Sequence, residues 1–341
     1  MAGPTAIFRY SKPYLSVIGQ IALLQGRGIE ITDTVAAGAC LGRIGYYRLS
    51  GYWYSSWKSH LVTNPLTGAI IPHPVSKKPQ IVVEDDFRPG TTFQQVMDLY
   101  VFDKRLRLLF LDAIERIEVA LRVDIALLIG ARDPWAHRDP NQLHGNFTKK
   151  VNPLHGQTDY AKWLERLDQT FDRSTDEFVK HFKQKYAGDY PPIWIAIELW
   201  DFGMLSVFLS GMAVADREKL AAKYGLPRHG LLTSWVRNIN NVRNICAHHS
   251  RLWNRSPADQ GSRLKRGEVP LLDHLVNNLH AESRIYATAA ALQFLLRTIN
   301  PSSSWGLRLK QHLATFPTTT VSTIDQAGFP VGWDQLPLWK A

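Results

Sequence analysis

The stretch SWVRNINNVRNICAHHSRLWN, residues 234–254, combines amide, basic and imidazole side chains with apolar residues at helical intervals. A helix turns by about 100° per residue, and an arc of about that width on the helical wheel holds six polar residues. These residues, here called the polar stripe, are Arg237, Asn240, Asn241, Asn244, His248 and Arg251. The stripe contains no acidic residue. Donors and cations suit a phosphodiester, because its non-bridging oxygens only accept hydrogen bonds. The sequence therefore predicts chemistry on a phosphate along this helix.

His248 is the candidate acid–base group of the stripe, since an imidazole exchanges protons near neutral pH. A histidine of the core is the alternative. Arg243 lies off the stripe, about 140° from His248 on an ideal wheel. Its long side chain reaches back to the stripe, or the helix is distorted near the two histidines, or Arg243 is structural. His249 points about 100° away from His248 and is expected to be supporting or structural. No third ligand stands at helical spacing, so a metal site is not expected.

Charged residues outside the stripe are interpreted as structural or as functional. Glu198, in WIAIELWDFG, either pairs with an arginine of the site or forms a buried ion pair that fixes helix packing. Glu118 and Arg122 stand four apart and are interpreted as a structural intrahelical pair. The basic runs at 147–150 and 263–267 are solvated loop charges, or phosphate contacts given the net charge.

The elements that must position these residues are mostly helices. Apolar residues at steps of three and four predict a long helix from Thr92 to Asp133. Further helices are expected over residues 160–186, 192–213, 215–224, 231–253 and 269–298. The segment before them reads as short helices, with Asp33 or Thr34 as an N-cap, followed by an extended loop or small hairpin over 64–89.

The predicted organisation has three parts. An N-terminal helical segment with its proline-rich loop or hairpin covers residues 1–90, and a helical domain covers 91–300. An irregular tail, 301–341, packs on the core and is anchored by two tryptophans in its closing segment. The fold class is therefore all-α.

The composition indicates which classes of binding partner and which cellular compartment suit the protein. The 341 residues include 40 Lys and Arg against 30 Asp and Glu, a net charge of +10 that favours polyanionic partners. An anionic membrane surface is the weaker choice, because no helix has a polar face of Lys and Arg alone. The N-terminus does not resemble a signal peptide. Cys40 and Cys246 form no ligand spacing, and the longest apolar run, 285–296, is too short to span a bilayer. A cytoplasmic location is expected.

The sequence resembles the Abi family of bacterial abortive-infection proteins, of the AbiD/AbiF-like group. RNICAHH fits the R-N-x-x-x-H signature of HEPN-type ribonucleases, with Arg243, Asn244 and His248 in the motif positions. The other blocks occur in the order of that family: YYRLSGYW (46–53), YVFDKRLRLLFLDAIERIEVALR (100–122), WIAIELWDFGMLSVFL (194–209), VRNICAHHSRLWN (242–254) and the closing GFP, W and PLW.

This resemblance implies a helical bundle of HEPN type and metal-independent RNA cleavage without a cofactor. The 2′-hydroxyl of the RNA attacks the adjacent phosphate and leaves a 2′,3′-cyclic phosphate and a 5′-hydroxyl. In this scheme His248 is the acid–base group, Arg243 meets the phosphate charge, and Asn244 positions the substrate or the histidine. The supporting or RNA-binding residues are Arg237, Asn240, Asn241, His249, Arg251 and Glu198.

The resemblance also implies partners. The single motif copy in the chain indicates a homodimer, because HEPN sites resemble composite sites built from two domains. RNA is the expected substrate, and a structured non-coding RNA, with which some relatives are thought to work, is a second candidate partner. The alternative function is a non-catalytic RNA-binding or scaffold protein on the same fold.

Overall fold

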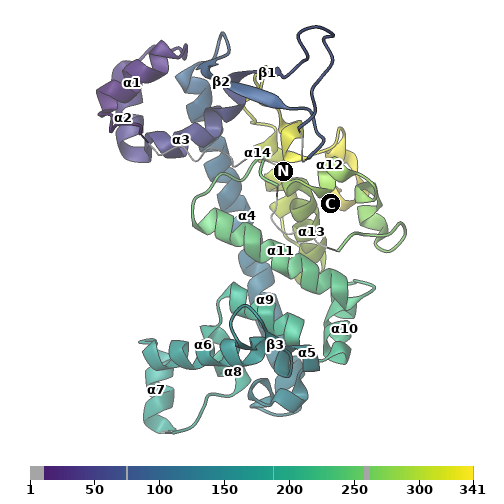
Figure 1. Cartoon of the computed structure of the whole chain (residues 1–341). Coiled ribbons are helices and arrows are strands. Elements are labelled where there is room, and N and C mark those ends of the chain that lie inside the picture. The colour runs from purple at the N-terminus through teal and green to yellow at the C-terminus, as the bar shows by residue number, and fades with distance from the viewer. Residues whose placement is uncertain (1–10, 74–75, 187, 257–261, 341) are drawn as a thin grey trace. The chain divides into compact units, whose positions relative to one another are not determined.

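The computed structural model describes residues 11–73, 76–186, 188–256 and 262–340, and it is mostly helical (Figure 1). This confirms the predicted all-α class, while the HEPN type stays a prediction. The first ten residues, on which the signal-peptide expectation rests in part, lie outside the described residues. The chain forms two compact units, residues 1–102 with 317–322, and residues 103–316 with 323–341.

The first unit contains short helices and one hairpin. Its elements are α1 (Val17–Gly26), α2 (Thr34–Ile44), α3 (Tyr46–Trp53), the 3-10 helix η1 (Tyr54–Ser56), the antiparallel strands β1 (Trp57–Leu61) and β2 (Ile81–Phe87), and the start of α4. Asp33 caps α2 by accepting a hydrogen bond from the Ala36 N–H at 2.8 Å, as predicted. The hairpin expected over residues 64–89 is present, but only β2 lies within that range, since β1 precedes it. Phe87 stacks on Trp57 with ring centroids 4.1 Å apart.

The second unit contains the rest of α4 (Phe93–Gly130) and the candidate site. Its other α-helices are α5 (Gly145–Thr148), α6 (Asp159–Arg173), α7 (Glu177–Lys185), α8 (Ile193–Ala196), α9 (Phe202–Gly211), α10 (Val214–Lys223), α11 (His229–Ala247), α12 (Leu279–Glu282), α13 (Ile285–Ile299) and α14 (Trp305–Leu313). Its 3-10 helices are η2 (Ala136–Arg138), η3 (Pro140–Gln142), η4 (Ile197–Leu199), η5 (Pro270–Leu275), η6 (Ile324–Ala327), η7 (Trp333–Gln335) and η8 (Pro337–Trp339), and β3 (Val151–Asn152) pairs with β4 (Gln157–Thr158).

Several predicted helices are wrong in their bounds, because local caps interrupt the apolar periodicity. Residues 160–186 form two helices, separated where Ser174 bonds the Asp176 carboxylate at 2.8 Å. Residues 192–213 divide at Asp201, whose side chain caps α9 through the Met204 N–H at 2.9 Å. Residues 269–298 comprise η5, α12 and α13. The tail expected to be irregular contains α14.

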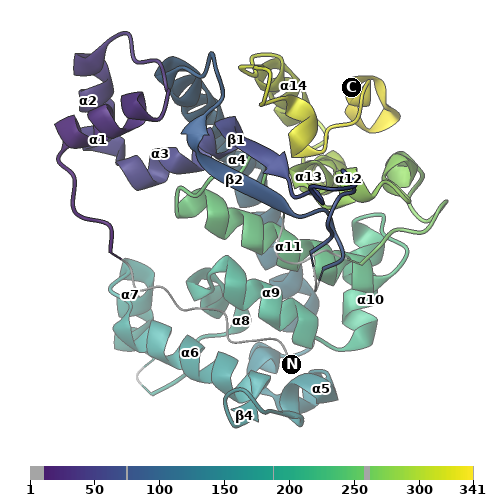
Figure 2. The same cartoon turned by 45° about the horizontal axis from the view of Figure 1, so that its top comes forward.

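The core of the second unit surrounds α9, α11 and α13. Helix α11 packs against α9, α10 and α13, and Figure 2 shows α9 and α10 beside it. Trp163, Trp200 and Phe208 form an aromatic cluster with centroids 4.7–4.9 Å apart. Among the described helices, none has both the length and the apolarity that a membrane crossing requires.

The two tryptophans of the closing segment do anchor it, as predicted. Trp333 and Trp339 meet edge to face at 4.8 Å between ring centroids, and both contact Tyr286 of α13. The Trp305 ring of α14 lies beside Trp339, and its indole N–H donates to the Leu109 carbonyl of α4 at 2.7 Å.

A buried carboxylate connects α4 to the segment that follows α11. Asp103 is fully buried and accepts hydrogen bonds from the N–H groups of Leu252 and Trp253, the shortest at 2.8 Å. Its other partner is Arg107, one turn further along α4, at 2.5 Å. Arg107 also reaches the Ser250 carbonyl at 3.4 Å. The turn after α11 is thereby bound to α4 through three backbone groups, those of Ser250, Leu252 and Trp253.

We expect Asp103→Ala to lower the free energy of unfolding by about 3–5 kcal/mol, because it leaves the buried Arg107 cation and two backbone N–H groups without their acceptor. Urea denaturation followed by circular dichroism measures this loss. The double variant Asp103→Leu with Arg107→Met removes both charges and should lose less than the single variant. An Asp103→Ala protein as stable as the parent would contradict the anchor.

Candidate functional site

Helix α11 carries the polar stripe, and its opposite face is buried. Leu232, Val236, Ile239, Val242 and Cys246 recur at steps of three and four, and all of them are buried. The helix begins without a side-chain cap at Arg228. Instead, the His229 N–H donates to a Glu218 carboxylate oxygen of α10 at 3.1 Å. Burial of this apolar face therefore sets which side of α11 can meet a ligand.

The helix ends at Ala247, six residues before the end that the periodicity predicted. His248 is the C-cap residue, and His249 adopts the left-handed conformation with φ 57°. The Ser250 N–H donates to the Ile245 carbonyl and the His249 N–H to that of Cys246, which together form a Schellman motif. Arg251 therefore lies beyond the helix, and the prediction that placed it on the polar stripe is wrong.

The remaining stripe residues differ in exposure. Arg237 and His248 are exposed, while Asn240, Asn241 and Asn244 are half-buried. Arg237 and Asn240 line a hollow toward α9 and α10, and Asn240 faces Gly203 in the first turn of α9. The N-terminal half of the stripe thus borders a cavity. Its C-terminal end presents His248 at the surface.

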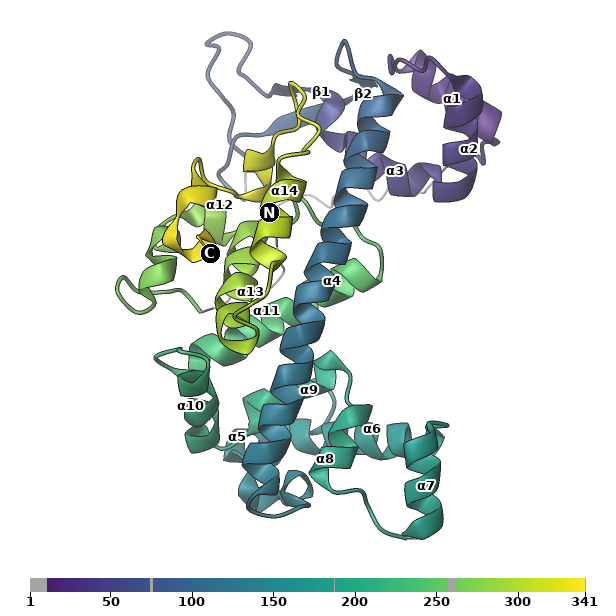
Figure 3. The same ribbon diagram turned by 180° about the vertical axis from the view of Figure 1, so that it is seen from behind.

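Arg243 faces α4 and also contacts one residue of the stripe, Asn244. It lines a hollow of about 440 Å³ with the α4 residues Leu108, Leu111, Asp112, Ile114, Glu115 and Glu118. Figure 3 shows α11 passing across α4 in this region. One guanidinium nitrogen of Arg243 lies 3.4 Å from the Asn244 side-chain oxygen. The long side chain thus reaches back to the stripe, which is one of the explanations left open by the sequence, but its contact there is with Asn244 and not with His248.

Glu118 lines the same hollow as Arg243, and the charge of that arginine acts on its carboxyl group. Burial raises the pKa of Glu118 above its ordinary value, although the cations Arg122 and Arg243 act to lower it. Arg122 binds Glu118 at 2.6 Å and the Trp200 carbonyl at 2.5 Å. The predicted intrahelical pair exists. Its carboxylate also faces α11, which makes Glu118 a candidate site residue that the sequence interpretation had treated as structural.

Glu198 is paired with Arg122 at 3.6 Å, and its side chain is 55% exposed. The alternative of a buried ion pair is therefore wrong, and the arginine that Glu198 meets belongs to α4 and not to α11. Helix η4 places Glu198 just before the Trp200 carbonyl that the same arginine binds. Glu198 thus belongs to a charged network, Glu118–Arg122–Glu198, that connects η4 to α4.

His248 is isolated from the other motif residues. Within the part of the chain that the structure describes, its imidazole has no hydrogen bond or ion pair, and it lines neither hollow. The structure brings Arg243 and Asn244 together but does not bring His248 to Arg243 within one chain. Cys246, between them in sequence, is buried, and burial raises the pKa of its thiol to about 12. It is therefore unsuited to act as a thiolate nucleophile at neutral pH.

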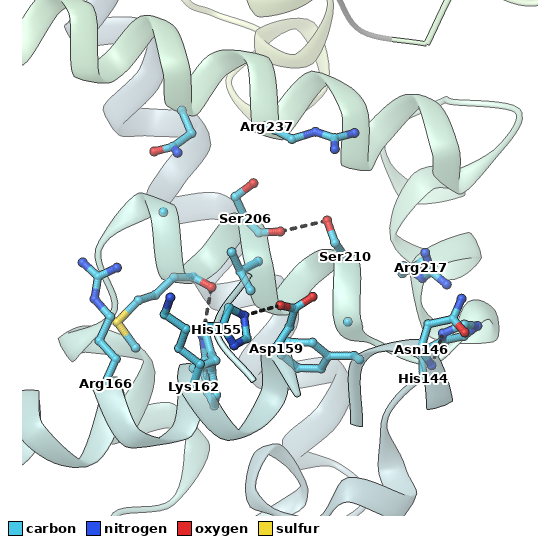
Figure 4. Close-up of a pocket in the computed structure, with 17 residues that line it drawn as sticks. His144, Asn146, His155, Asp159, Lys162, Arg166, Ser206, Ser210, Arg217 and Arg237 are labelled. Carbon is cyan, nitrogen blue, oxygen red and sulfur yellow. Dashed lines mark hydrogen bonds and ion pairs between the residues drawn. The ribbon is translucent and has the colours of Figure 1, made fainter. Parts of the chain in front are cut away.

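A second hollow, here called the basic hollow, lies where α5, α6, α9, α10 and α11 meet (Figure 4). Its volume is about 740 Å³. The cations Lys162, Arg166, Arg217 and Arg237 line it, together with His144, His155 and a single carboxylate, Asp159. Arg237 alone among these cations was predicted to be a site residue. Lys162 and Arg166 belong to α6 and Arg217 to α10, on helices with ordinary solvated patterns, so no local signal in the sequence marks them.

No group of three or more His, Cys, Asp or Glu side chains placed to hold a metal ion occurs among the described residues. Residues 39–254 match a family model described as Abi-like protein, and this stretch covers more than half of the chain and includes α11. Among curated proteins and among solved structures, no match to this chain was found.

We expect Glu118→Gln to raise the melting temperature at neutral pH. A carboxyl whose pKa is raised by folding binds protons more tightly in the folded chain, so its ionisation destabilises the fold as pH rises through and above the ordinary value of 4.5. The advantage of the neutral amide should shrink below that pH. Differential scanning calorimetry of the parent and the variant, at neutral pH and at a pH below 4.5, measures this difference in melting temperature.

Glu115→Gln is the matched control, because Glu115 lines the same hollow but is exposed. Its substitution should change the melting temperature little at either pH. A Glu118→Gln advantage that does not depend on pH would contradict the assignment of the effect to ionisation of Glu118.

Proposed function

The chain belongs to the Abi-like protein family, and from that premise we propose that it is a metal-independent endoribonuclease of HEPN type. Membership of the family suggests a function in abortive infection. Cleavage of RNA during phage infection is the finer proposal, and it rests on the motif residues Arg243, Asn244 and His248. The net charge of +10 suits RNA as the substrate.

The observation that carries the proposal is the position of His248. It caps the C-terminus of α11, is exposed, and has no side-chain partner among the described residues. A histidine of the core, which was the alternative, would be buried and hydrogen-bonded. An exposed imidazole at the end of a stripe of amide donors fits acid–base chemistry on a bound phosphodiester.

The proposed reaction moves one proton at each end of the scissile bond. A neutral imidazole takes the proton of the 2′-hydroxyl while that oxygen forms a bond to phosphorus. A protonated imidazole gives its proton to the 5′-oxygen as the bond from phosphorus to that oxygen breaks. The products are a 2′,3′-cyclic phosphate and a 5′-hydroxyl, and no water is consumed. Amide and guanidinium donors stabilise the charge that develops on the phosphorane.

One imidazole per site suffices for this scheme, because the proton that it takes from the 2′-hydroxyl is the proton that it gives to the 5′-oxygen, and a homodimer holds two such sites. Because Arg243 points to α4 while His248 is exposed beyond the helix end, we propose that each site combines His248 of one protomer with Arg243 of the other. Val119, Val123 and Leu127 form an exposed apolar strip at steps of four on α4, which offers a surface for such pairing.

The rival proposal is an RNA-binding protein without catalysis. The observation that favours it is the acidic setting of Arg243, since Asp112, Glu115 and Glu118 line the same hollow and oppose an incoming phosphate. In that case the basic surface alone acts, and His248 has no special effect. The two proposals differ in what His248→Ala does.

We expect His248→Ala to abolish cleavage of end-labelled RNA in EDTA, while RNA affinity and melting temperature stay close to those of the parent, because the side chain is exposed and unpartnered. Product ends identified by phosphatase and kinase treatment report the 2′,3′-cyclic phosphate. His249→Asn is the matched control. It removes the adjacent imidazole but keeps a residue that tolerates the left-handed conformation, and it should retain cleavage.

Cleavage that persists in His248→Ala would sink the site assignment. Tight RNA binding by the parent without any cleavage, unchanged in His248→Ala, would favour the binding protein.

A mixture of Arg243→Ala and His248→Ala chains tests the composite site. If each site takes one residue from each protomer, a mixed dimer holds one complete site and one doubly altered site. Random assortment then restores about a quarter of the parent activity. Each variant alone should be inactive, and co-purification through two different tags isolates the mixed dimer. No recovery in a confirmed mixed dimer would show that each chain builds its own site.

A further inference from the structure

The basic hollow has the size and lining of a ligand site. Its volume of about 740 Å³ falls in the range of small-molecule sites. Apolar groups of Phe147, Trp163, Met204 and Val207 form part of the lining, and hydroxyl and amide groups come from Ser206, Ser210 and Asn146. Figure 4 shows Arg217 on the same side as His144 and Asn146, with Lys162 and Arg166 toward the other side.

Arg217 is a partly buried cation of this hollow that makes no ion pair among the described residues, although the charge of the adjacent Glu218 acts on it. Its Nε atom is buried and makes no hydrogen bond. Burial lowers the pKa of Arg217 below its ordinary value, which records a charged group removed from water. The neighbouring Glu218 is engaged by His229, through its backbone N–H at 3.1 Å and its ring at 3.8 Å. A partly buried cation without a partner is costly, and an anionic ligand removes that cost.

The groups around Arg217 add positive charge. Burial and the charges of Arg217 and His144 all lower the pKa of His229, so these three groups lie within electrostatic reach of one another. On the α6 side, Arg166 is paired with Asp201, and Lys162 is exposed without an ion pair among the described residues. The single lining carboxylate, Asp159, is engaged by Asn152 at 2.8 Å and His155 at 3.0 Å.

We propose that the basic hollow binds a phosphorylated ligand of the size of one nucleotide, with its phosphate on Arg217. An arginine fork suits a phosphate because it donates two parallel hydrogen bonds. The remaining volume, with its apolar groups, accommodates the body of the ligand. The source is either a free nucleotide or one nucleotide of an RNA strand. Neither the hollow nor Arg217 belongs to the R-N-x-x-x-H motif, so this proposal does not depend on cleavage.

Both sources are compatible with the position of the hollow on α11. Arg237 and Asn240 belong to the hollow and to the polar stripe, and His248 lies eight residues beyond Asn240. At 1.5 Å per residue, this corresponds to about 12 Å along the helix direction. An RNA strand that follows the stripe from His248 would reach the hollow within a few nucleotides.

Isothermal titration of the full chain with adenosine monophosphate, and with a short 2′-O-methyl RNA that cannot be cleaved, tests the proposal. The variants are Arg217→Gln and, as matched control, Lys219→Gln, which removes an exposed cation from the same helix outside the hollow. We expect Arg217→Gln to weaken binding roughly tenfold to a hundredfold, the effect of losing a charged hydrogen bond. Lys219→Gln should change it little.

Stability without ligand gives a second readout. Because Arg217 makes no ion pair among the described residues, Arg217→Gln should melt at or above the temperature of the parent. Arg217→Lys should fold equally well and bind with intermediate affinity, since it keeps the charge and loses the fork. A fall in melting temperature for Arg217→Gln would mark a structural role and overturn the proposal.

The same titrations distinguish a free nucleotide from a nucleotide of an RNA strand. Stronger binding of the monophosphate identifies a free nucleotide, and stronger binding of the oligonucleotide, with loss in Arg217→Gln, identifies a unit of the RNA. The proposal would be overturned if neither ligand binds, or if Lys219→Gln weakens binding as much as Arg217→Gln does. The parent and His248→Ala should bind the monophosphate equally, so a failed cleavage experiment does not affect this result.

Discussion

The candidate site depends on one buried interaction, the carboxylate of Asp103 at the point where the chain turns after α11. This group accepts the N–H groups of Leu252 and Trp253 and binds Arg107 at 2.5 Å. Because Asp103 and Arg107 both lie on α4, the long helix serves as the frame against which the end of α11 is set. Without this anchor the exposed His248 would stand on a loose terminus, and a loose group loses the advantage of preorganisation.

The geometry after His248 shows what that anchor has to overcome. His249 adopts φ 57°, which costs an L-residue roughly 1–2 kcal/mol relative to a right-handed conformation. Glycine is the usual residue at this position of a Schellman motif. The strain is tolerated because hydrogen bonds on both sides over-determine the turn, from Ser250 back to Ile245 and from Leu252 to Asp103. A strained residue directly after the motif histidine agrees with a turn shaped for function.

Structural features that depend only on neighbouring residues were predicted correctly from the sequence. The all-α class, the long helix α4, α10 and the Asp33 cap follow from periodicity and capping alone. The pattern fails at Asp201 and after Ala247, where a cap and a left-handed turn end helices whose apolar spacing continues. The basic hollow was not predictable at all, because its cations come from α6, α10 and α11 and meet only through tertiary packing.

The two halves of α11 border hollows of different charge, one that contains Arg217 of α10 and one that contains Arg243. Arg243 shares its hollow with Asp112, Glu115 and Glu118 of α4, and its charge acts to lower the pKa of Glu118. Arg217 makes no ion pair among the described residues, although the charge of Glu218 acts on it, and its hollow holds four cations against one engaged carboxylate. The excess of positive charge at the basic hollow favours an incoming phosphate there over the acidic hollow beside α4. Under the two proposals, affinity for a polyanion resides at the N-terminal half of the stripe and proton transfer at its C-terminal end, so that binding and chemistry can be separated by substitution.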